Sequence, residues 1–163
     1  MNHVSSNYDR RPRAGGLDWA AIARDAAGKG ADDWSVAEAM LCILLTAATS
    51  DGVVAPEEGA EMQGVIGRSR ILKMLSTEQL CAADAVIAER MRANRQEAFA
   101  AACKHIPPSL RLPIFAQAID VVMADGNLKA PESAFLNELV AQFSIGDENA
   151  KQIAEVLFVK NLC

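Results

Sequence analysis

The sequence predicts an all-α fold, and three observations support this prediction. The stretch from Ala39 to Thr49 contains no charged side chain, and a helix that is apolar on every side is normally buried. Apolar residues also recur with the 3.6-residue period of a helix, at Leu136, Leu139 and Phe143. No stretch alternates apolar and polar residues in the way that a half-buried strand does. We therefore expect a single all-α domain of seven or eight helices.

Length and composition fit a globular domain with an apolar core. The chain has 163 residues, of which 51% are hydrophobic, so it can bury a sizeable core. Its formal net charge of −5 argues against a partner held by phosphate contacts, because such binding needs a basic face. Aromatic residues make up 5% of the chain, which does not favour stacking on single strands. We therefore expect no nucleic-acid partner.

The cysteines and the N-terminal residues indicate the compartment. No two of the cysteines are close enough in sequence for a CxxC-type metal site; they are Cys42, Cys81, Cys103 and Cys163. The N-terminal residues have no apolar segment of the kind that an export signal needs. No apolar run reaches the roughly 20 residues of a membrane span. We expect a cytoplasmic protein with reduced thiols and no membrane span.

The chain divides into a short tail and one helical domain. Residues 1–16 are polar, contain three arginines and end in two glycines, so we expect a mobile N-terminal tail. Residues 17–163 form the expected all-helical domain, and its first helix is predicted over residues 18–27. The central helix follows Ser35, which is a good N-cap because Glu38 stands three residues later, as in a capping box.

Further start and stop signals predict the remaining helices. A helix is expected from Pro56 to Gly67, and a second capping box, Ser76 to Gln79, opens the next one. The polar residues 89–95 predict a bend or a solvated face, followed by a helix over 96–105. Another helix begins at Pro108 or at Pro113, and the sequence leaves this choice open. A helix over 131–143 and a final helix after Gly146 complete the chain, the final one buried by Ile153, Val156, Leu157 and Phe158.

A weak internal duplication organises the acidic residues. Asp51-Gly52 follows the central helix, and Glu58 stands in the first turn of the next. At an offset of 74 residues, Asp125-Gly126 and Glu132 repeat this scheme. Glycine can take the left-handed conformation that closes a helix, and an acid favours the start of the next one. The sequence thus predicts two pseudo-repeated helix–DG turn–helix hairpins.

The spacing of these acids resembles the second half of an EF-hand loop, but the first half is missing. Loop positions 1 and 3 hold Val121 and Met123 in one loop and Ala47 and Thr49 in the other. Neither pair supplies the hard oxygen ligands that calcium needs. A true EF-hand is therefore excluded.

Two interpretations of the acidic loops stay open. One is a simple divalent-cation site for Ca²⁺, Mg²⁺ or Mn²⁺, whose candidate ligands are Asp51, Glu58, Asp125 and Glu132. The other is purely structural: the glycine ends one helix, and the glutamate stabilises the N-terminus of the next. Asp120 lies about 140° from Asp125 around a straight helix, so it need not face the same site.

Repeated apolar helix–DG–hydrophobe–Glu units in an all-helical domain resemble the tellurite-resistance TerB-like family. The segment Ile106–Ile145 carries the likeness most clearly, with a proline-led helix, the acidic loop and a further helix in order. The likeness runs from about Ser35 to the C-terminus. It implies a cytosolic helical module associated with tellurite and chemical-stress resistance, or a module attached to other domains. It also implies metal binding at the acidic loops and no established catalytic residue.

The sequence offers little support for an enzyme. Only His3 and His105 are available as histidine bases, and neither has a recognisable partner acid or nucleophile. We expect a non-catalytic module with a protein partner that the sequence does not identify. The alternative to ion binding is therefore a protein-interaction or scaffold domain with purely structural acidic loops.

Overall fold

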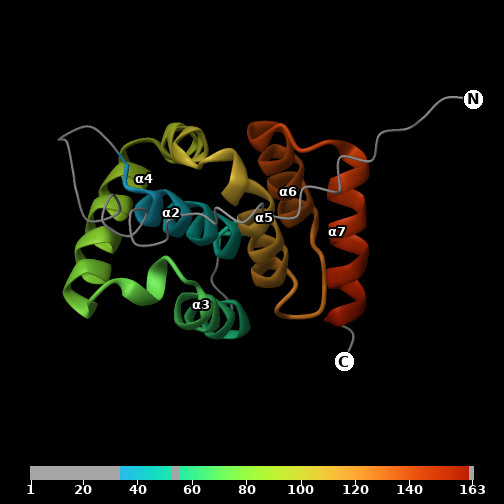
Figure 1. The fold of residues 1–163 in the computed structure, drawn as a ribbon, viewed down its shortest axis with the longest axis horizontal. Helices are drawn as coiled ribbons and strands as arrows, with labels where there is room; N and C mark the ends of the chain where they lie inside the picture. Colours follow the sequence, from blue (N-terminus) through green and yellow to red (C-terminus); the bar gives the residue numbers. More distant parts are fainter. Residues whose placement is uncertain (1–33, 53–55, 162–163) are drawn as a thin grey trace, which may run out of the picture.

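The computed structural model describes residues 34–52 and 56–161, and these residues form helices without a strand (Figure 1). The predicted all-α class is therefore confirmed for this part of the chain. Its elements are α2 (Val36–Ala48), α3 (Pro56–Arg68), the 3-10 helix η2 (Leu72–Met74), α4 (Thr77–His105), α5 (Pro108–Val122), α6 (Ala130–Phe143) and α7 (Asp147–Lys160). The described part thus has six α-helices. The tail expected at 1–16 and the helix expected at 18–27 lie outside the described residues.

Helix α2 is the central element, as its uncharged sequence predicts. It contacts α3, α4, α5 and α6, and Figure 1 shows it in the middle of the molecule. Of its 13 residues, only Val36 and Leu45 are not fully buried. The capping box is present: the Ser35 amide donates to Glu38 Oε2 at 3.0 Å, and the Glu38 amide donates to Ser35 Oγ at 3.2 Å. These bonds satisfy backbone N–H groups at the N-terminus of α2 inside the core, where unpaired N–H groups would destabilise the fold.

An arginine from α4 closes the other end of α2. Arg95 donates from Nη2 to the carbonyl oxygens of Thr46 and Thr49, at 3.3 and 2.8 Å, and to the Thr49 hydroxyl. Thr46 lies in the last turn of α2 and Thr49 is its C-cap, a region where carbonyls lack intrahelical donors. A cation at the C-terminus also complements the helix dipole.

Helix α4 is broken at Asn94, within the polar stretch where a bend is predicted. Asn94 has φ −160° and ψ 101°, which is extended backbone inside a helix of 29 residues. Its Oδ1 accepts a hydrogen bond from the Glu97 amide at 3.1 Å, so Asn94 acts as the N-cap of the second segment. The second segment then ends at His105, as expected. Because α4 contains both segments, the described part has six helices, fewer than the seven or eight expected for the whole chain.

Helix α5 begins at Pro108, which settles the choice left open by the sequence. Pro113 lies inside this helix, and α5 continues past it to Val122. Seven of its 15 residues are buried, and the helix contacts α2, α3, α6 and α7.

Helix α7 packs along the edge of the molecule against α5 (Figure 1). None of its residues is fully buried, and Ile153, Leu157 and Phe158 are the half-buried contacts to the core. The expectation that Val156 is buried is wrong, because this side chain is 68% exposed. Val159 is exposed to a similar extent, at 66%.

Candidate functional site

The two DG turns have the same backbone conformation. Gly52 has φ +90° and Gly126 has φ +79°, a region that residues with a Cβ rarely adopt. The amide of Gly52 donates to the Thr49 carbonyl at 3.1 Å, and the amide of Gly126 donates to the Met123 carbonyl at 2.9 Å. These two bonds lie at the offset of 74 residues that the sequence indicates. A left-handed glycine of this kind lets the chain leave the end of a helix in a sharp turn.

The second loop uses its acids as caps. Asp125 Oδ1 accepts a hydrogen bond from the Asn127 amide at 2.9 Å, which fixes the turn. Glu132 Oε2 accepts from the Lys129 amide at 2.6 Å, which closes the N-terminus of α6. The capping role expected for Glu132 is therefore observed in the structure.

A lysine joins the two acidic loops. The Nζ atom of Lys129 lies 2.9 Å from Asp51 Oδ2 and 3.2 Å from Asp125 Oδ2. It also lies 3.7 Å from Glu132 Oε1. Three of the four predicted ligand residues therefore surround one ammonium group. Asp51 comes from the loop after α2, Asp125 and Lys129 come from the loop between α5 and α6, and Glu132 comes from the first turn of α6.

The charges in this cluster affect one another. The pKa of Lys129 is raised, first by its hydrogen bond to Asp51 and then by its hydrogen bond to Asp125. The pKa of Asp125 is lowered, mainly by the Asn127 amide and further by Lys129. Since the Lys129 side chain is 41% exposed, solvent screens these interactions. Three carboxylates face one ammonium, so the cluster keeps an excess of negative charge.

The two glutamates are much more buried than the aspartates. The Glu132 side chain is 1% exposed, and its Oε1 atom has no hydrogen-bond partner in the structure. The aspartate side chains of the cluster are 22% and 24% exposed for Asp51 and Asp125. Glu58 is also buried, in the first turn of α3, and is not one of the three carboxylates that contact Lys129.

Asp120 belongs to a different ion pair. Its Oδ1 accepts from Lys160 Nζ at 2.6 Å and from the Asn161 side chain at 3.3 Å. This contact ties the end of α7 to α5. The structure thus gives Asp120 a role away from the acidic loops, in keeping with its predicted orientation.

The present positions of these side chains do not form a metal cage. Within residues 34–52 and 56–161 there is no group of three or more His, Cys, Asp or Glu side chains that could hold a metal ion. The point on which the three carboxylates converge is filled by the lysine ammonium instead. Sequence reasoning missed Lys129, although one signal was available: Lys129 stands four residues after Asp125 and three before Glu132, whereas the first loop has Ala55 at that position.

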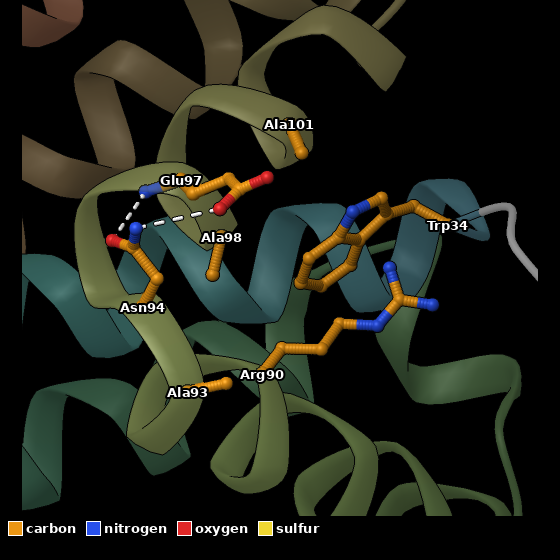
Figure 2. A pocket seen from close by; sticks show the side chains of 7 residues that line it. All are labelled: Trp34, Arg90, Ala93, Asn94, Glu97, Ala98 and Ala101. Carbon is orange, nitrogen blue, oxygen red and sulfur yellow. Dashed lines mark hydrogen bonds between the residues drawn. The ribbon is translucent and has the colours of Figure 1, made fainter.

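A cavity also lies at the kink of α4 (Figure 2). Its volume is about 360 Å³, and it is lined by Trp34, Arg90, Ala93, Asn94, Glu97, Ala98 and Ala101. The guanidinium of Arg90 lies 4.3 Å from the centre of the Trp34 ring, a cation–π contact. The lining contains no serine, cysteine or histidine side chain.

His105 has the structural role expected at a helix end. Its Nδ1 atom lies 3.0 Å from the Ala101 carbonyl oxygen, one turn earlier in α4. The thiols of Cys42 and Cys103 are buried, and burial raises their pKa to about 11 and about 12. Thiols with raised pKa values are poor nucleophiles at neutral pH.

The fold and the acidic loops define a class of protein: an all-α module built around a buried central helix, with two acidic DG turns linked by a lysine. No helix in the described part of the chain has the length and apolar character to cross a membrane. The family model of the tellurite resistance protein TerB matches residues 37–155. The chain therefore belongs to the TerB family, as its motifs indicate. No curated protein and no solved structure shows a significant match to it.

Proposed function

We propose that this chain is a non-catalytic module that binds a divalent cation weakly between its two acidic loops. The observation that carries the proposal is the convergence of Asp51, Asp125 and Glu132 on one point, which a cationic group already occupies. Carboxylate oxygens are the ligands that Ca²⁺, Mg²⁺ and Mn²⁺ prefer. The fourth predicted ligand, Glu58, does not belong to this cluster, and we propose it only as a ligand of an ion bound at the first loop.

Membership of the TerB family supports the physiological side of the proposal. The family is described by tellurite resistance, and the resemblance implies a cytosolic module that takes part in a chemical-stress response. A non-catalytic role is supported by the site itself. The groups that converge are three carboxylates and one lysine ammonium, and the only histidine in the described part bonds a helix carbonyl.

The affinity is expected to be low. Only three carboxylates converge, and a site with few charged ligands binds calcium with a Kd of about 10⁻⁴–10⁻³ M. Binding to the folded state alone stabilises it by RT ln(1 + [L]/Kd), about 2.7 kcal/mol at a hundredfold excess over Kd. Millimolar Ca²⁺, Mg²⁺ or Mn²⁺ should therefore raise the melting temperature of the native chain.

Isothermal titration calorimetry of the native chain with each chloride salt tests the proposal. The matched variant is Asp125→Asn, which keeps the size of the side chain and its turn-forming oxygen but removes the charge. Asp120→Asn is the control, because its carboxylate is paired with Lys160 elsewhere. Heat that is present for the native chain and for Asp120→Asn, but lost for Asp125→Asn, supports the proposal. Flat traces for the native chain reject it.

A protein-interaction module is the second candidate function. The observation that favours it is the outer face of α7, where Val156 and Val159 are 68% and 66% exposed at a spacing of three residues. Neighbouring apolar side chains on one helix face are a common feature of contact surfaces. Under this alternative the acidic loops are structural. A protein partner that binds the native chain but not Val156→Glu would support the interaction module. A partner that does not bind Asp125→Asn would show instead that the acidic loops form the binding surface.

A further inference from the structure

The Lys129 ammonium occupies the position that a bound cation would take. Its Nζ atom lies 2.9, 3.2 and 3.7 Å from oxygens of Asp51, Asp125 and Glu132. Divalent ions hold carboxylate oxygens at about 2.0–2.6 Å, closer than any of these contacts. An ion coordinated by these oxygens and the ammonium therefore cannot be present at the same point together.

Glu132 provides an independent indication that this space accepts a further cation. Its side chain is 1% exposed, and Oε1 lacks a hydrogen-bond partner in the structure. A buried carboxylate oxygen without a donor is costly, because it has lost its contacts with water. The ammonium is too distant to donate a good hydrogen bond to it. A smaller ion with a higher charge would satisfy this oxygen better.

The lysine side chain is not needed to build the loop. The cap of α6 uses the backbone amide of Lys129, which donates to Glu132 Oε2 at 2.6 Å and is retained whatever side chain is present. Gly52 takes the same left-handed conformation as Gly126, and the sequence has Ala55 at the position that matches Lys129. Since the Lys129 side chain is 41% exposed, it can leave the cluster for solvent without disturbing the core.

We propose that Lys129 is a built-in competitor for the cation site: a divalent ion binds by displacing its ammonium. The inference rests on the proposed function and adds its regulation. With the lysine in place, the ammonium holds Asp51 to the second loop. With the ion bound, the ion makes this link instead, and the lysine side chain is released to solvent. Competition of this kind lowers the apparent affinity of the native chain for the ion.

Substitution of Lys129 tests this competition directly. Lys129→Met removes the charge and keeps an unbranched side chain, and Lys129→Arg keeps a cation. The matched control is Lys160→Met, which removes a lysine from the ion pair with Asp120. Titration calorimetry with CaCl₂ and MnCl₂ is run on the native chain and on all three variants. We expect Lys129→Met to bind about tenfold tighter or more, and the other two to bind like the native chain.

The possible results separate the competitor role from the proposed function. Equal, measurable affinity of the native chain and Lys129→Met overturns the competitor role and leaves the proposed function standing. Binding by Lys129→Met with a flat trace for the native chain rejects ion binding by the native chain, and with it the displacement of the Lys129 ammonium by an ion. Flat traces for both overturn both. Circular dichroism checks that each variant is folded, and Lys129→Gln replaces Lys129→Met if that variant is not.

A second measurement follows the lysine itself. In the native chain labelled with ¹³C and ¹⁵N, NMR signals of the Lys129 side chain should shift when CaCl₂ is added, since its ammonium leaves three carboxylates. The Lys160 signals serve as the internal reference and should not move. Saturable calcium binding without any change at Lys129 would overturn the displacement, even if the affinities of the variants differ.

Discussion

Glu132 offers the sharpest test of how the buried acid stabilises the fold. The change is Glu132→Ala, compared with Glu138→Ala on the same helix, where the glutamate is exposed. Glu132 Oε2 closes α6 through the Lys129 amide, and loss of such a cap costs about 0.5–2 kcal/mol. The substitution also removes one buried methylene group, Cγ, at about 0.8 kcal/mol. Removing the negative charge offsets part of this loss, because Oε1 is buried without a hydrogen bond.

The sum predicts that Glu132→Ala lowers the free energy of unfolding by about 1–2.5 kcal/mol. Glu132→Gln should lose less, about 0.5–1 kcal/mol, because the amide oxygen can still accept from the Lys129 amide. Glu138→Ala should stay within about 0.5 kcal/mol of the native chain. Urea denaturation followed by circular dichroism measures all three. If Glu132→Ala and Glu138→Ala melt alike, the capping bond and the burial of Glu132 do not stabilise the protein in the way argued above.

Three further predictions concern the fold. Leu139→Ala should lower the free energy of unfolding by about 2–5 kcal/mol in urea denaturation, because Leu139 is 0% exposed. Leu112→Ala is the control and should lower it clearly less, because Leu112 is 39% exposed. Equal losses would contradict the placement of Leu139 in the core. Ser144 ends α6 with φ +52°, so Ser144→Gly should raise the free energy of unfolding by about 0.5–1 kcal/mol, and a loss of stability would refute the strain. Burial raises the pKa of the Cys42 thiol from 9.0 to about 11, so iodoacetamide at pH 8 should label the exposed Cys81 and not Cys42, as read by peptide mass spectrometry. The same shift makes stability fall as pH rises from about 9 towards 11, because the unfolded thiol ionises before the folded one.

Local features of the fold could be predicted from the sequence because they depend on residues close together in the chain. The capping boxes at Ser35 and Ser76 need only a partner three residues away, and both are present in the structure. The break of α4 at Asn94 falls in the stretch 89–95, in which five of the seven residues are polar. The left-handed glycines follow from the Asp-Gly pairs. In each of these cases the local chemistry and the fold favour the same conformation.

Contacts between distant residues could not be predicted in this way. Lys129 and Asp51 are 78 positions apart, and no pattern in one sequence states that they meet. The same holds for Arg95, which closes α2 from 46 positions away. The exposure of Val156 was mispredicted for a related reason: α7 lies at the edge of the molecule, so only one of its faces has a neighbour. Helical periodicity identifies an apolar face, but it does not state which element covers it.

Capping and cation binding, which the sequence presents as alternatives, are compatible in this structure. The two oxygens of Glu132 are divided between them: Oε2 accepts from the α6 amide, and Oε1 faces the ammonium. A change at Glu132 therefore perturbs both roles and cannot separate them. Asp51 can separate them, because its contact with the second loop runs through the side chain of Lys129 and not through the cap of α6. Asp51→Asn should thus weaken ion binding and free the Lys129 side chain, while the cap of α6 is retained. The NMR signal of the Lys129 backbone amide measures the cap. A shift of this signal as large as that caused by Glu132→Gln would show that capping and cation binding are coupled.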